Sequence, residues 1–201
     1  MRRVVVLALL ALALPMATWA DTITLTNQFG TVSMTNAGIV SKGMQLTSFN
    51  GIVPPKGHSL GSVSYATGAL TSGSVAAGGT FSSVGSSFVV IGKGNFGQPK
   101  GVIFNGAFVG GANAITWTLI SHVGQSLKYE LTGNIAGQLY TGRIVSGTTT
   151  QDITTHPGQL AKGIGHATLG NTQLNTPEPG TLGLLGTGLL GIAGTFRRKK
   201  A

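Results

Sequence analysis

The stretch Ile115-Thr116-Trp117-Thr118-Leu119-Ile120 decides the fold class of this chain. Its apolar side chains at positions 115, 117 and 119 alternate with two threonines. Successive side chains of a β-strand point to opposite faces, so this alternation gives one apolar face and one polar face. The same period of two recurs at residues 22–27 and 128–132. The pattern predicts half-buried strands of an antiparallel sheet.

The rest of the central region repeats this design. Denser apolar runs at residues 88–91 and 102–104 predict central strands, and Asn50-Gly51, Gly78-Gly79 and Gly110-Gly111 predict turns. No sustained helical period is present, and no repeat of fixed length supports a stacked β-solenoid. We therefore predict a mainly β domain over residues 21–170, as an antiparallel sandwich or a barrel-like fold, followed by a linker at residues 171–180. The Gly- and Thr-rich run at residues 159–175 fits either a final strand or a linker.

Composition narrows the class of protein. The chain has 201 residues, 33 Gly and no Cys, and only 8% of its residues are charged. The lack of Cys excludes disulfide scaffolds, zinc–thiolate sites and cysteine nucleophiles. Much of the net charge of +9 comes from the two ends, at positions 2, 3 and 197–200. Because no basic run lies between them, the sequence predicts no nucleic-acid partner.

Residues 1–20 have the organisation of a signal peptide. Arg2 and Arg3 precede an apolar run at residues 4–14. As a helix this run spans about 16 Å, too short to cross a hydrocarbon core of about 30 Å. Small residues at positions 18 and 20 fit a cut by signal peptidase between Ala20 and Asp21. The alternative is an uncleaved N-terminal anchor.

The C-terminal region carries a second targeting pattern. Pro177-Glu178-Pro179 interrupts regular structure, because proline lacks the amide hydrogen and disfavours helix in the residue before it. Residues 181–196 are uncharged and predict a single transmembrane helix. The tail at residues 197–201 is basic, through Arg197, Arg198, Lys199 and Lys200. Such a cluster is expected to stay in the cytoplasm, which places the β domain outside, in agreement with a signal peptide.

This arrangement resembles the PEP-CTERM sorting signal of bacteria with Gram-negative envelopes. The resemblance rests on Pro177, Glu178 and Pro179, the span at residues 181–196 and the basic cluster at residues 197–200. It implies recognition by an exosortase, a membrane cysteine protease or transpeptidase, and cleavage near the tripeptide. The C-terminal helix would then be a transient anchor in the inner membrane. Thr176 departs from the family pattern, in which an apolar residue often precedes the tripeptide.

One motif in the central region suggests hydrolysis. Gly57-His58-Ser59-Leu60-Gly61 matches the nucleophile elbow G-x-S-x-G, and Asp152 with His156 or His166 follows in the order of a serine hydrolase. The elbow requires a helix after the serine, whereas residues 62–65 predict a strand. The context therefore argues against a serine hydrolase.

Two further patterns are similarly weak. Residues 92–97 match G-x-G-x-x-G, but Pro99 follows in place of a helix, which favours a hairpin loop over a dinucleotide site. Glu130 and Asp152 are the acids available for glycoside hydrolysis, but they lie 22 residues apart. The histidines, at positions 58, 122, 156 and 166, lack metal-ligand spacing. We therefore expect neither a metal nor a cofactor.

Exposed aromatic rings would be the candidates for a carbohydrate platform. Trp117 is in phase with Ile115 and Leu119, which predicts that it is buried. Tyr65, Tyr129 and Tyr140 stay open as candidates.

Together these patterns predict an exported, non-enzymatic protein with a structural or adhesive role at the cell surface or in the exopolysaccharide matrix of a biofilm. Its expected partners are signal peptidase and exosortase during export, the membrane before processing, and exopolysaccharide afterwards. The alternatives are a carbohydrate-binding module that attaches to exopolysaccharide, and a serine hydrolase.

Overall fold

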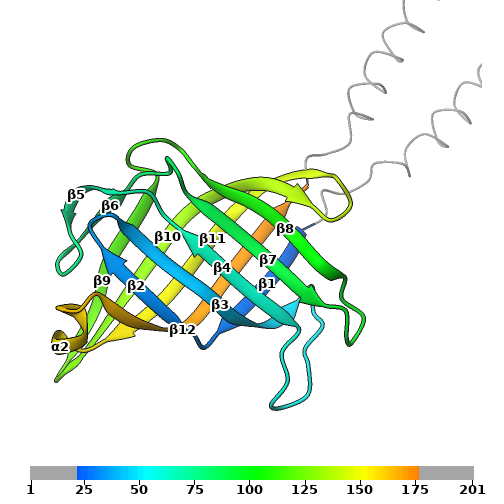
Figure 1. The fold of residues 1–201 in the computed structure, drawn as a ribbon, viewed down its shortest axis with the longest axis horizontal. Helices are drawn as coiled ribbons and strands as arrows, with labels where there is room; N and C mark the ends of the chain where they lie inside the picture. The colour runs from blue at the N-terminus through cyan, green and yellow to red at the C-terminus, as the bar shows by residue number, and fades with distance from the viewer. Residues whose placement is uncertain (1–21, 177–201) are drawn as a thin grey trace, which may run out of the picture. The chain divides into compact units, whose positions relative to one another are not determined.

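The computed structural model of the chain describes residues 22–176. These residues form a closed antiparallel barrel of eight strands (Figure 1). In chain order the ring strands are β1 (Thr22–Gln28), β3 (Gly38–Phe49), β4 (Gly61–Ala66), β7 (Ser87–Lys93), β8 (Lys100–Val109), β10 (Ser126–Leu139), β11 (Ile144–Thr155) and β12 (Ile164–Asn175). Around the ring the order is β3, β4, β7, β8, β10, β11, β12 and β1. The ring closes because β1 pairs with both β12 and β3.

Four further strands and one helical turn extend one end of the ring. They are β2 (Thr31–Thr35), β5 (Leu70–Ser74), β6 (Gly78–Phe81), β9 (Ile115–Val123) and α2 (Pro157–Leu160). β2 pairs with β12 and β3, and β9 continues along β10 past the end of β8. β6 then pairs with β9, and β5 with β6. We call this the helix end of the barrel, because α2 lies there.

The opposite end holds both ends of the described chain. Thr22, the first residue of β1, pairs with Asn175, the last residue of β12. The loops at residues 50–60, 94–99 and 140–143 lie at this same end, since they follow β3, β7 and β10. We call these three loops the chain-end rim.

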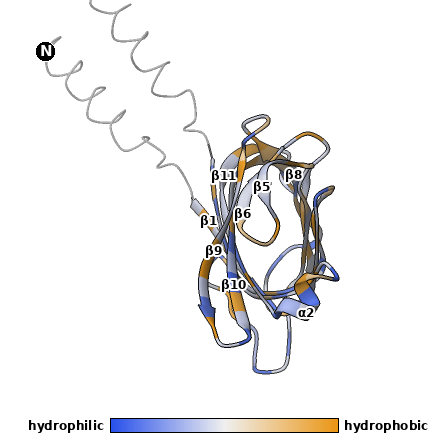
Figure 2. Ribbon diagram, turned by 90° about the vertical axis from the view of Figure 1, so that its left-hand side faces the viewer, coloured by the Kyte–Doolittle hydropathy of each residue, from blue (hydrophilic) through white to orange (hydrophobic). Residues whose placement is uncertain are grey.

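Apolar side chains that point inward fill the barrel. An aromatic cluster of Tyr65, Phe88, Phe104 and Phe108 has ring centroids 6.0–6.3 Å apart. Figure 2 shows the strands curving into a closed wall on which apolar and polar residues alternate. The strands predicted at residues 22–27, 115–120 and 128–132 are confirmed as parts of β1, β9 and β10. The denser runs at residues 88–91 and 102–104 lie in the ring strands β7 and β8.

A polar network crosses three neighbouring strands inside this apolar core. Asn27 on β1 donates from Nδ2 to Gln151 Oε1 on β11 at 2.9 Å, and Gln151 donates from Nε2 to Thr149 Oγ1 at 2.8 Å. The Thr149 hydroxyl lies 2.9 Å from that of Thr172 on β12. All four side chains are buried. Gly170 of β12 pairs with both Asn27 and Gln151, and its missing side chain leaves the space in which the two amides meet.

Of the two architectures predicted, the barrel is confirmed. Two other predictions about the domain are corrected. The β domain ends at Asn175 and not at residue 170, because β12 continues far enough to bury Leu174 between β1 and β11. Gly78-Gly79 starts β6 instead of forming a turn. A Cβ atom on Gly78 would lie 2.8 Å from the Trp117 carbonyl oxygen, so glycine there allows β6 to approach β9.

The predicted targeting segments lie outside the described residues. These are the signal peptide with Ala20 and Asp21, the tripeptide at residues 177–179, the helix at residues 181–196 and the basic tail at residues 197–201. Within residues 22–176, no helix has the length and apolar character needed to span a membrane.

Candidate functional site

The predicted Ser–Asp–His arrangement is not assembled. Ser59 lies at the chain-end rim, and its nearly buried hydroxyl accepts a hydrogen bond of 2.6 Å from Lys93 Nζ. His156 and His166 lie toward the helix end, beside α2 and near the start of β12. Asp152 is bound to another lysine on the outer wall. The predicted strand after Ser59 is confirmed as β4, so the helix that a nucleophile elbow requires is replaced by a strand.

The contact at Ser59 is a hydrogen bond from a lysine, because the Nζ of Lys93 donates to the serine hydroxyl. The nearest histidine in sequence, His58, packs edge-on against the Phe96 ring, with centroids 6.0 Å apart. The two contacts therefore join residues 58 and 59 to the end of β7 and to the loop that follows it.

The predicted hairpin loop at residues 92–97 is confirmed, since β7 and β8 pair at Lys93 and Lys100 on either side of it. Gln98 fastens this loop to its neighbour, because its buried Nε2 donates to the Leu60 carbonyl and to Asn95 Oδ1, both at 2.6 Å. Sequence reasoning missed Gln98, because no local pattern marks a glutamine whose partner is a backbone carbonyl 38 residues away.

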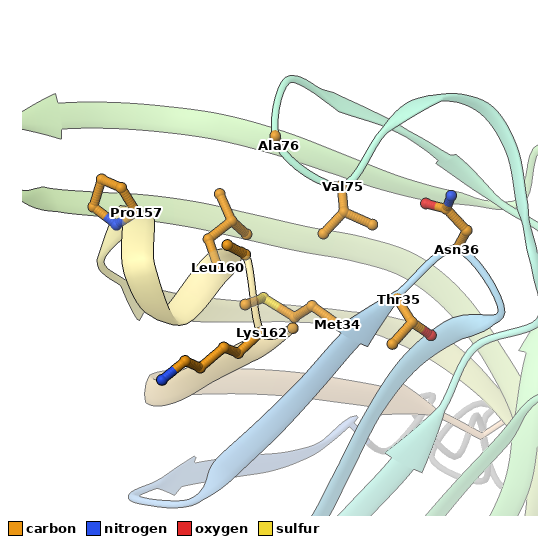
Figure 3. A pocket seen from close by; sticks show the side chains of 10 residues that line it. Met34, Thr35, Asn36, Val75, Ala76, Pro157, Leu160 and Lys162 are labelled. Atoms are coloured by element: carbon orange, nitrogen blue, oxygen red, sulfur yellow. The ribbon is translucent and has the colours of Figure 1, made fainter.

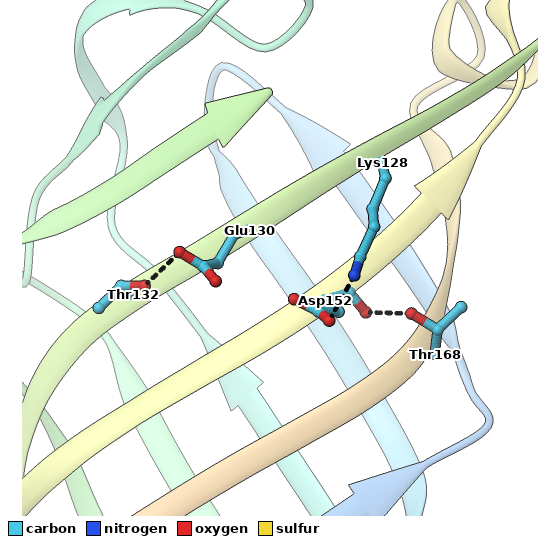
Figure 4. Close-up of polar contacts among 5 residues, drawn as sticks. All are labelled: Lys128, Glu130, Thr132, Asp152 and Thr168. Atoms are coloured by element: carbon cyan, nitrogen blue, oxygen red, sulfur yellow. Dashed lines mark hydrogen bonds and ion pairs between the residues drawn. The ribbon is translucent and has the colours of Figure 1, made fainter. Parts of the chain in front are cut away.

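Glu130 and Asp152 are cross-strand neighbours, although they are distant in sequence. They pair directly in the register of β10 and β11 and face out of the barrel (Figure 4). Asp152 Oδ2 accepts an ion pair of 2.8 Å from Lys128 Nζ, and Glu130 Oε1 accepts a hydrogen bond of 3.4 Å from Thr132. The two acids therefore lie on the outer wall, with one of them already neutralised by a lysine.

The aromatic candidates divide between core and surface. Trp117 is buried, as predicted, and stacks on Tyr129 with ring centroids 4.6 Å apart. Tyr65 is also buried, and burial raises the pKa of its hydroxyl well above the ordinary value. Burial likewise raises the pKa of Tyr129. Of the three tyrosines only Tyr140 is exposed, so it alone remains a candidate for ligand stacking.

The chain-end rim collects positive charge and exposed aromatic rings. It carries or borders four exposed basic residues, Lys56, Lys93, Lys100 and Arg143. Phe96 and Tyr140, which are 45% and 56% exposed, lie in the two loops that flank the start of β8. The two acids of residues 22–176, Glu130 and Asp152, both lie on the outer wall, outside the rim loops. This surface has the chemistry to bind an acidic polymer with flat apolar faces.

The backbone at Phe96 adds a second feature to the rim. Its φ is +59°, a left-handed conformation that costs about 1–2 kcal/mol for a residue with a side chain. Such a conformation persists only where the surrounding structure imposes it. Phe29, in the link between β1 and β2 midway along the barrel wall, has φ +55° and is 62% exposed. The two residues therefore form a natural pair for comparison.

A pocket of about 570 Å³ opens at the helix end (Figure 3). It lies between the turn after β2, the turn between β5 and β6, and α2. Val75, Leu160 and Met34 point toward one another across it, and Lys162 stands at its edge. Sequence reasoning did not find this pocket, because its walls come from three segments that are far apart in the chain. Among residues 22–176, no group of three His, Asp or Glu side chains is placed to hold a metal ion.

Comparison with known proteins identifies the C-terminal region and leaves the barrel without a match. No curated protein matches the chain, and no solved structure matches it. One family model does, over residues 175–199: the PEP-CTERM protein-sorting motif. This motif supports export, transient membrane anchoring through the tail and processing by an exosortase. The chain thus carries a PEP-CTERM protein-sorting motif that begins at Asn175, the last residue of the barrel.

Proposed function

We propose that the protein is a non-enzymatic structural or adhesive component of the outer cell surface or the extracellular matrix, delivered there as a closed barrel. The observation that carries this proposal is the pairing of Thr22 with Asn175. These residues begin and end the barrel, and they directly adjoin the predicted signal-peptidase site and the sorting motif. Removal of both flanking segments leaves every strand and every strand pairing of the barrel intact.

The composition of the barrel interior supports a role without catalysis. Aromatic and aliphatic side chains fill it, and its central amides from Asn27 and Gln151 are hydrogen-bonded to each other. The side chains that sequence patterns suggested for hydrolysis are held in structural contacts, Ser59 by Lys93 and Asp152 by Lys128. Any detected esterase activity is therefore expected to be unchanged in Ser59→Ala.

Carbohydrate binding is the second candidate, and the chain-end rim favours it. Four cations beside two exposed aromatic rings suit an acidic polysaccharide, whose carboxylates pair with the cations while its sugar rings lie on the aromatic faces. Exposed charge pairs are screened by salt, so this binding should weaken as ionic strength rises.

Co-sedimentation with insoluble polysaccharides tests both candidates on protein recovered from the cell exterior. For carbohydrate binding, Phe96→Ala and Lys100→Glu should reduce retention on an acidic polymer such as crosslinked polygalacturonate, while cellulose retains little of any form. Phe29→Ala is the matched control, because it removes an exposed phenylalanine of the same backbone conformation outside the chain-end rim. Equal retention of all variants would reject the rim as a polysaccharide site. Absence of the protein from both the surface and the matrix fractions would reject the wider proposal.

A further inference from the structure

The pocket at the helix end has fixed walls. Trp117 Nε1 donates to the Val75 carbonyl at 2.8 Å, and the Tyr129 hydroxyl donates to the Ala76 carbonyl at 2.7 Å. The turn between β5 and β6 is therefore fastened to the barrel wall by two buried aromatic side chains. On the other side, the Met34 amide donates to the Gly163 carbonyl at 2.7 Å, which holds the segment after α2 against β2. A pocket with fastened walls needs little rearrangement to accept a ligand.

The lining has two chemical zones. Val75, Leu160 and Met34 provide an apolar interior (Figure 3). Val75 and Leu160 are only partly buried, although they pack against the core. The edge carries Lys162 and Asn36, whose side chains form no hydrogen bond or ion pair within residues 22–176. No acidic residue lines the pocket.

These zones define the class of ligand. An apolar chain would cover Val75 and Leu160, and an acidic head would meet the free ammonium of Lys162 at the mouth. The volume of about 570 Å³ lies within the range of about 300–1,000 Å³ that is usual for small-molecule sites. We propose that the helix-end pocket binds an amphipathic carboxylic acid of the fatty-acid type. This proposal is independent of the function proposed above, because the pocket and the chain-end rim lie at opposite ends of the barrel.

Photolabelling tests the proposal on the full chain in lipid nanodiscs. The probes are a photoreactive fatty acid and the matching fatty alcohol, and mass spectrometry of peptides locates the attached label. We expect the acid to label the peptides that contain Val75 or Leu160. Excess unlabelled fatty acid should reduce this labelling by competition for the pocket. A probe that has only partitioned into the lipid of the nanodisc would not label these peptides.

Two kinds of variant test the apolar interior and the charged edge of the pocket separately. Val75→Trp fills the apolar interior and should abolish labelling by both probes, whereas Val84→Trp, at an exposed loop position, should leave it unchanged. Ala161→Trp, from the opposite wall, repeats the test if Val75→Trp fails to fold. Lys162→Glu should lower labelling by the acid about fivefold, in line with an exposed charge pair of about 1 kcal/mol, and leave labelling by the alcohol within about twofold. Lys42→Glu, at an exposed position of β3, is the control for net charge.

The labelling results can either establish or overturn the proposed site. Pocket labelling that both tryptophan variants abolish, with an acid preference that Lys162→Glu removes, would establish the site. Label confined to other peptides, or pocket label that neither filling variant affects, would overturn the proposal. Equal labelling by acid and alcohol in the unmodified chain would overturn the assigned head group.

Discussion

Gly170→Ala tests the idea that a missing side chain organises the barrel interior. A Cβ atom at this position would contact Gln151 Oε1 and both amide atoms of Asn27. The methyl group must therefore either separate the two amides or push β12 away from its neighbours.

Each of these two responses lowers the free energy of unfolding by a different route. Separated amides leave two buried polar groups without their partners, at about 1–3 kcal/mol for each group. Displaced strands overpack the core, at about 1–3 kcal/mol. We therefore expect Gly170→Ala to lower the free energy of unfolding by about 1–6 kcal/mol, against a total of about 5–15 kcal/mol that is typical of a domain.

Urea denaturation followed by tryptophan fluorescence measures this loss. In the processed protein Trp117 is the sole tryptophan, because the other one, Trp19, lies in the predicted signal peptide. Gly158→Ala is the control: this exposed glycine has no atom within 4 Å of an added Cβ, and its substitution should change stability by less than about 0.5 kcal/mol.

A double variant tests whether the loss of stability in Gly170→Ala comes from its contact with Gln151. Gln151→Ala removes one amide and makes room for the new methyl group, so Gly170→Ala should cost less in that background. A coupling energy above about 0.5 kcal/mol would support this account. A loss below about 0.5 kcal/mol for Gly170→Ala alone, or strictly additive losses, would refute it.

Three further predictions concern the barrel. Trp117→Phe removes the donor to the Val75 carbonyl and should cost about 1–3 kcal/mol, measured by the same urea titration; an unchanged midpoint would show that the turn is not fastened there. Because burial raises the pKa of Tyr65 in the fold, the unfolded state releases this proton first, and stability should fall as pH rises above about 10. Thermal melts from neutral to alkaline pH check this, and Tyr65→Phe should flatten the fall. Lys128→Ala breaks the ion pair with Asp152 on the outer wall and should cost less than about 1 kcal/mol by chemical denaturation; a larger loss would mark the pair as structurally essential.

The strands were predictable because their signal is local. An alternating run such as residues 115–120 records which side chains face the core, and so does the run at residues 128–132. Closure of the ring was not predictable, because it depends on β1 pairing with both β12 and β3. A sandwich would require the same alternation in each strand, so the sequence pattern cannot distinguish the two architectures.

The sites show the same division between local and distant contacts. The absence of a helix after Ser59 was readable from the residues that follow it, but its contact with Lys93 joins two loops of different hairpins. The separation of Glu130 from Asp152 in the sequence obscured their direct pairing, because the register of a long hairpin determines which residues face each other. The sorting motif was readable in full, because its elements are consecutive in the chain.

The intact mass of the protein recovered from the cell exterior tests the central claim most directly. The unprocessed chain has a mass of 20.4 kDa. We expect a smaller species that begins at Asp21 and ends within residues 177–180, which is a barrel released through its sorting motif. A species that retains residues 181–201 and stays in the membrane fraction would contradict release, and with it the proposed role at the surface or in the matrix.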